Sequence, residues 1–142
     1  EGILSGVVIY GPQSRPTFAE NEVCGNRESG IFVFAAAQPR IADNVCRGNH
    51  HFGIAVRDPG SHPELVRNRC QENMLSGILL FHHAEALLVD NTCSENQHWG
   101  MVMTPDCHPT PGREALDTSN ILAPNPRGTL IVTDQPLGDI GR

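Results

Sequence analysis

The chain has 142 residues, which fits one domain, and it carries a net charge of −6. All ten basic residues are arginines, scattered among more numerous acids, so no basic stripe for nucleic acid is present and an acidic membrane surface is an unfavourable partner. No apolar run approaches the length of about eighteen residues that indicates a transmembrane helix. With 14 Gly, 11 Pro and few aromatic residues, the composition is typical of a turn-rich β protein.

One repeat occupies almost the whole chain, which opens inside a partial copy at Gly6 and therefore reads as a mature product or a fragment of a longer protein. Each full copy has an Asn, a second Asn five residues later, a Gly four residues after that, and a short apolar run. The four full copies are NEVCGNRESGIFVF, NVCRGNHHFGIAVR, NRCQENMLSGILLF and NTCSENQHWGMVMT, and they begin at Asn21, Asn44, Asn68 and Asn91. A degenerate fifth copy begins at Asn120 after a longer interval of 29, which predicts an insertion at about residues 105–116.

The apolar runs predict strands, because they are short and rich in β-branched residues. The connections are too short for crossover helices, so equivalent strands of successive copies are expected to stack in parallel, about 4.8 Å apart. Such parallel crossovers are right-handed in about 98% of cases. The sequence therefore predicts an all-β fold: a right-handed parallel β-helix of about five coils with 23–24-residue repeats over residues 1–133, followed by a C-terminal tail at 134–142.

Equivalent positions then form columns. The main strand sends inward Ile31, Val33, Ile54, Val56, Ile78, Leu80, Met101, Met103, Leu130 and Val132. Two further inward columns are Phe18, Ile41, Leu65 and Leu88, and Val23, Cys46, Cys70, Cys93 and Leu122. The Asn rows are expected at corners, where Asn tolerates left-handed backbone and its amide can bond its counterpart one coil away. The repeated Gly is expected at a tight bend into the strand.

The pattern N-x-C-x-x-N-x-x-x-G-I-x-V, with an x-P-x-I lead-in, resembles the right-handed β-helix repeats of the carbohydrate-binding and sugar hydrolase type, within the pectate-lyase-like superfamily. Similar repeats occur in alginate epimerases, in periplasmic copper-site maturation proteins and in the substrate-recognition region of certain F-box proteins. The resemblance covers about residues 3–133 and implies the fold, but the matching positions are structural.

For activity, the resemblance implies either a polysaccharide lyase, hydrolase or epimerase, or a recognition module. The chain has no Lys, no strand with paired Asp residues, no Gly-His-Gly signature and no DPHD-like motif. We therefore assign no catalytic residue, and the enzymatic interpretation is the weaker one.

The cysteines and histidines raise the question of metal. Five cysteines without a C-x-x-C pair indicate neither a disulfide framework nor a zinc finger, and they favour a reducing, cytoplasmic compartment while leaving a secreted or periplasmic location open. In the turns after the main strands, stacking would bring together His82, His83, Asp106, Cys107 and His108. This set suits zinc or another divalent metal, and the alternative is solvated turn residues. No other cofactor is predicted.

The outward side of the main strands is unusually apolar for a solvated sheet, which is typical of an interface. A protein partner or self-association is therefore predicted at Phe32, Phe34, Arg57, Leu79 and Phe81. The insertion or the tail could instead fold over this face.

The leading hypothesis is a non-catalytic scaffold that recognises a protein partner through this apolar strand face. The alternative is a carbohydrate-binding or carbohydrate-active β-helix that takes a polysaccharide around Arg57, His82, His83 and Asp106.

Overall fold

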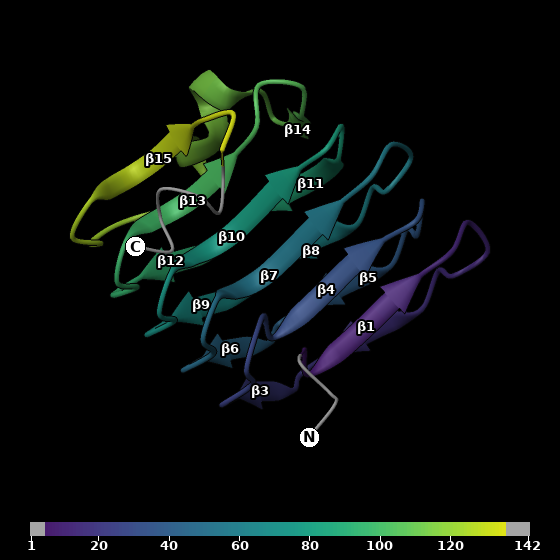
Figure 1. Cartoon of the computed structure of the whole chain (residues 1–142), viewed down its shortest axis with the longest axis horizontal. Coiled ribbons are helices and arrows are strands. Elements are labelled where there is room, and N and C mark those ends of the chain that lie inside the picture. The colour runs from purple at the N-terminus through teal and green to yellow at the C-terminus, as the bar shows by residue number, and fades with distance from the viewer. Residues whose placement is uncertain (1–4, 136–142) are drawn as a thin grey trace.

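The computed structural model describes residues 5–135, which form a solenoid of parallel strands wound around one core (Figure 1). Each full coil contributes one strand to each of three sheets, so strands that are neighbours in a sheet come from successive coils. Figure 1 shows the coils stacked from the purple N-terminal end to the yellow C-terminal end. The predicted parallel β-solenoid of about five coils is confirmed.

Sheet A contains β1 (Val7–Tyr10), β4 (Ile31–Phe34), β7 (Phe52–Arg57), β10 (Ser76–Phe81), β13 (Trp99–Met103) and β15 (Gly128–Val132). Sheet B contains β2 (Thr17–Ala19), β5 (Arg40–Ala42), β8 (Glu64–Val66), β11 (Glu85–Val89) and β14 (His108–Thr110). Sheet C contains β3 (Glu22–Cys24), β6 (Val45–Arg47), β9 (Arg69–Gln71) and β12 (Thr92–Ser94). One 3-10 helix, η1 (Arg113–Thr118), lies between β14 and β15. No helix among residues 5–135 is long and apolar enough to cross a membrane.

The strand register agrees with the predicted inward columns. Ile31 pairs with Ile54 and Ile54 with Ile78 in sheet A, and Cys46 pairs with Cys70 in sheet C. Nearly all predicted core side chains are buried in one continuous cluster. The exceptions lie in the terminal coils: Phe18 and Leu130 are half-buried, and Val132 is 38% exposed. The prediction that Val132 belongs to the core is wrong, because β15 is the last strand of sheet A and no described strand pairs with it on its outer side.

Two ladders of Asn side chains run the length of the stack, as predicted. In the first ladder, the Nδ2 of Asn44 donates to Oδ1 of Asn68 at 3.0 Å, and Nδ2 of Asn68 donates to Oδ1 of Asn91 at 3.1 Å. The second ladder runs in the same way from Asn26 to Asn125. Each Oδ1 that accepts the amide also accepts the backbone N–H of the preceding Asn, so a buried polar side chain is satisfied at every step.

The corners differ from the prediction in one detail. In the four full copies, the left-handed residue is the one that precedes each ladder Asn, for example Asp43 (φ 59°) and Arg67 (φ 53°), and the Asn itself is not left-handed. The repeated Gly also has another role than a bend. A Cβ on Gly77 would lie 2.7 Å from the carbonyl oxygen of Gly100 and 2.7 Å from Cβ of Cys93. Close approach between coils therefore requires the missing side chain.

The segment at 105–116 does not cover the apolar face of sheet A. It supplies β14, which pairs with β11 at the end of sheet B, and then the start of η1. The side chain of Leu116 on η1 is buried in the main core, and its carbonyl accepts the Nδ2 of Asn120 at 2.8 Å. This segment therefore closes the C-terminal end of the core. Of the predicted tail, residues 136–142 lie outside the described residues.

Candidate functional site

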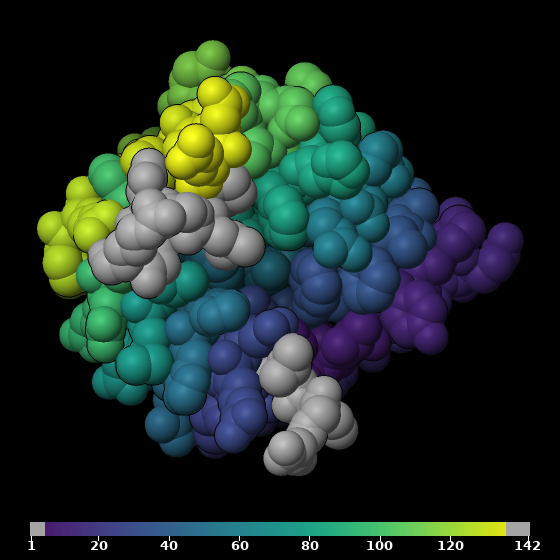
Figure 2. All heavy atoms as spheres, viewed as in Figure 1, coloured from purple at the N-terminus to yellow at the C-terminus, as the bar shows by residue number. Residues whose placement is uncertain are grey.

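The outer face of sheet A, which faces the viewer in Figures 1 and 2, carries two outward columns of side chains. The register places in the first column Val8, Phe32, Ala55, Leu79, Val102 and Ile131. The second contains Tyr10, Phe34, Arg57 and Phe81, with Tyr10 paired to Phe34 and Phe81 to Arg57. Both columns come from strands whose inward residues are fixed in the core, so the outward residues hold fixed positions as well.

Part of this face is buried by neighbouring side chains of the same coils. Ala55, Leu79 and Val102 are buried, because they pack with Phe52 and Leu75 in a second apolar cluster on the outside of the sheet. Leu79, predicted as a partner-binding residue, is only 2% exposed. The other predicted residues of the surface, Phe32, Phe34, Arg57 and Phe81, remain partly exposed.

An arginine lies on aromatic rings at the middle of the second column. The Cζ of Arg57 is 5.2 Å from the ring centre of Phe32 and 5.0 Å from that of Phe34. Tyr10, which is 60% exposed, stacks on Phe34 with ring centres 5.4 Å apart and planes inclined by 14°. A guanidinium over aromatic faces is held by cation–π attraction, which orients its remaining donors. The group is therefore a preorganised aromatic–arginine cluster that faces solvent.

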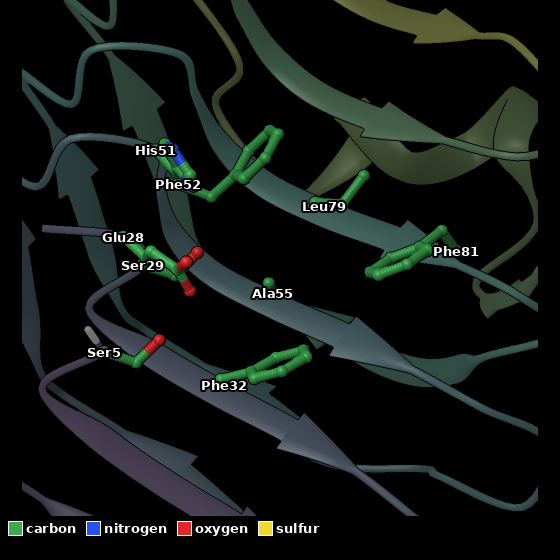
Figure 3. Close-up of a pocket in the computed structure, with 9 residues that line it drawn as sticks. All are labelled: Ser5, Glu28, Ser29, Phe32, His51, Phe52, Ala55, Leu79 and Phe81. Atoms are coloured by element: carbon green, nitrogen blue, oxygen red, sulfur yellow. The ribbon is translucent and has the colours of Figure 1, made fainter. Parts of the chain in front are cut away.

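A small apolar hollow adjoins this cluster. It has a volume of about 80 Å³ and lies above Ala55, between Phe32 and Leu79, with the rings of Phe52 and Phe81 at its sides (Figure 3). The hollow exists because a methyl group stands where the neighbouring coils carry Phe and Leu. Its polar rim, formed by Ser5, Glu28, Ser29 and His51, lies at the starts of the strands (Figure 3).

Two histidine–aspartate pairs lie in the turns that follow sheet A. His82 and His83 both have left-handed backbone (φ 59° and 65°) in the turn after β10. The Nε2 of His82 is 4.0 Å from Oδ1 of Asp58, and Nε2 of His83 is 3.4 Å from Oδ2 of Asp106. A hydrogen bond from the Thr104 hydroxyl, followed by the backbone and charge of His83, lowers the pKa of Asp106. These pairs line a solvent-open edge.

The five predicted metal ligands are only partly brought together. His83 and Asp106 are neighbours, but Cys107 is 1% exposed and its side chain belongs to the core. His108 lies on β14 in sheet B, where it pairs with Glu85. Burial also raises the pKa of Cys107, which disfavours the thiolate that a metal needs. Within residues 5–135, no group of three or more His, Cys, Asp or Glu side chains is arranged to hold a metal ion.

The cysteine column behaves as part of the core. Cys46, Cys70 and Cys93 are fully buried in register, and all five cysteines are free thiols. Hydrogen bonds with Cys46 and Cys93, together with burial, raise the pKa of Cys70 well above its usual value. The three stacked side chains therefore fill space between coils as small core residues.

Sequence reasoning missed two contributors to this face, Phe52 and Trp99. Both stand directly before the repeated Gly, upstream of the apolar runs that were predicted as strands. The structure shows that this position begins the strand and points outward, since Phe52 and Trp99 join the outer apolar cluster. The sequence did contain a signal: the residue at this position alternates between serine and an aromatic residue along the stack, as Ser29, Phe52, Ser76 and Trp99.

Comparison with known proteins concerns the fold. The family model described as "Right handed beta helix region" matches residues 3–120, which is most of the chain. Among curated proteins and among solved structures, none matches the chain. The match and the parallel solenoid agree with the resemblance to the pectate-lyase-like superfamily. The chain therefore belongs to the family of right-handed β-helix regions.

Proposed function

We propose that the chain is a non-catalytic binding module that recognises a protein partner through the outer face of sheet A. The observation that supports this function is the exposed aromatic–arginine cluster of Tyr10, Phe34 and Arg57 beside an apolar hollow. Aromatic residues and arginine are the side chains most enriched at the energetic centres of protein interfaces. A rigid solenoid also presents them with little conformational entropy to lose on binding.

The test places a photo-crosslinking amino acid at Tyr10 and, as a control, at the exposed Thr17 on the outer face of sheet B. In cells that express the chain, we expect a discrete covalent adduct from position 10 that is absent from position 17. Phe34→Ser is expected to abolish the adduct, and light scattering distinguishes a foreign partner from a second copy. Equal adducts at both positions, or none at either alongside a strict monomer, would contradict the proposal.

A second candidate is binding or cleavage of a polysaccharide at the edge after sheet A. The specific observation in its favour is an open hollow of about 360 Å³ lined by the aromatic Phe81 and by His82, Asp106 and Asp134. The pair of His83 and Asp106 offers an acid and a base at 3.4 Å. The nearby carboxylates disfavour polyuronates, so the screen includes neutral polysaccharides as well as acidic ones. Cleavage that is lost in His83→Ala would favour this candidate, whereas no binding and no cleavage would exclude it.

A further inference from the structure

We infer that the hollow over Ala55 and the guanidinium of Arg57 form one two-point site, which binds a short peptide stretch with a bulky apolar side chain next to a carboxylate. This inference rests on the proposed function and names the partner chemistry that the face selects.

The hollow fits one side chain. Phe32 pairs with Ala55 and Ala55 with Leu79, so a single small residue interrupts a bulky column and leaves about 80 Å³ between apolar walls. That space is too small for a folded element and too apolar to hold water with two or more hydrogen-bond partners. An aliphatic or aromatic side chain that enters it removes apolar surface from water on both molecules.

Arg57 has donors to offer. Its Nε is buried and forms an ion pair at 3.3 Å with Oδ1 of Asp58 that lacks hydrogen-bond geometry, so the terminal nitrogens are the donors that a ligand can reach. In the described part of the chain, its terminal nitrogens donate to no side chain or carbonyl either. A planar guanidinium fixed over Phe32 and Phe34 is suited to a carboxylate, which accepts two parallel hydrogen bonds. The neighbouring Asp58 carboxylate disfavours a more highly charged anion such as a phosphate.

The two points are close enough for one peptide stretch. Phe32 lies under the guanidinium and also lines the hollow, and Phe81 lines the hollow while it pairs with Arg57 across the sheet. The opposite rim carries Glu28, which repels a carboxylate. This charge asymmetry directs the acidic residue of the peptide to the Arg57 side of the hollow and keeps it away from Glu28.

The experiment selects random heptapeptides on phage against the full chain and three variants. Arg57→Glu reverses the charge, and Ala55→Leu fills the hollow. The control Arg40→Glu reverses an arginine on sheet B whose side chain is 44% exposed, against 38% for Arg57. We expect at least ten-fold enrichment of peptides with a large apolar residue within two positions of Asp or Glu, on the original chain and on Arg40→Glu. On Arg57→Glu the acid should be replaced by Lys or Arg, and on Ala55→Leu the apolar preference should disappear.

Three results would overturn the inference: selected peptides that lack acidic residues, selection of the same peptides by Arg57→Glu as by the original chain, or no enrichment of any peptide. Circular dichroism shows whether each variant is folded. If Arg57→Glu is unfolded, Arg57→Met, which keeps the apolar stem and loses the charge, takes its place. A crosslink from position 10 without this peptide preference would refute the two-point site and leave the proposed function standing. Selection of these peptides without any crosslinked protein from position 10 would support the two-point site and contradict the proposed function.

Discussion

Replacing Asn68 by Ala tests the energetic role of the ladder at a buried step. The side chain makes four hydrogen bonds: Nδ2 donates to the carbonyl of Ile41 at 2.9 Å and to Asn91 at 3.1 Å, and Oδ1 accepts the backbone N–H and Nδ2 of Asn44 at 3.1 and 3.0 Å. Each bond contributes about 1 kcal/mol, and the buried N–H of Asn44 that loses its acceptor adds a further penalty of about 1 kcal/mol or more. We expect a loss of about 5 kcal/mol in the free energy of unfolding, a large part of the about 5–15 kcal/mol that domains have.

The matched control is Asn21→Ala, in the same row at the N-terminal end. Asn21 is exposed, and its Nδ2 makes only two bonds, to Ala19 and Asn44, while its backbone N–H keeps its bond to Asn44. Water replaces what is lost there, so the expected cost is about 1 kcal/mol. Equilibrium urea unfolding, followed by Trp99 fluorescence and circular dichroism, measures both. Equal costs for the two variants would refute the claim that the buried ladder holds the coils together.

Three further predictions concern packing, thiols and pH. Gly77→Ala should cost about 2–3 kcal/mol in urea unfolding, because the new Cβ would lie 2.7 Å from a carbonyl oxygen of the next coil; an unchanged midpoint would show that the coils can separate freely. Iodoacetamide should modify only the exposed Cys24 in the native chain and all five thiols after unfolding, as counted by mass spectrometry; rapid modification of a second thiol would contradict this. A hydrogen bond with Arg67 lowers the pKa of Asp43, so its stabilising contribution is present above the ordinary carboxyl pKa of 3.8 and is lost as pH falls through the lower native pKa. Asp43→Asn should therefore flatten the acid side of the stability–pH curve, and an unaltered curve would argue against the pairing.

Most of the fold could be predicted because each coil repeats the same physical requirements. The intervals of 23 and 24 residues between Asn21, Asn44 and Asn68 set the strand register directly, and the structure has the same register. The ends could not be predicted in this way. Val132 has the inward parity of Val33 and Val56 but lies in the last strand of sheet A, and Leu116 closes the core from a segment outside the repeat.

The candidate site was predicted only in part, because its details depend on side chains that differ from coil to coil. Parity identified Phe32, Phe34 and Arg57 as outward residues, and the structure adds that the guanidinium lies on both rings. Parity could not show that Leu79 is covered or that Ala55 leaves a hollow, because both follow from the size of neighbours in other coils. Cys107 was grouped with outward turn residues, whereas the turn after β13 sends it into the core.

The inward and outward columns of sheet A differ in how much their side chains vary from coil to coil. The inward columns keep similar side chains from coil to coil, since a change of size there leaves a cavity or a clash. The outward column passes from Phe32 to Ala55 to Leu79, although the stacking of the backbone requires none of these changes. Such residues are free to be chosen for what they contact outside the sheet, while two Asn ladders fix their spacing. A ligand of this face is therefore expected to lie across the strands and to contact one side chain from each coil. A substitution in one coil should then change the residue preference at one position of the ligand.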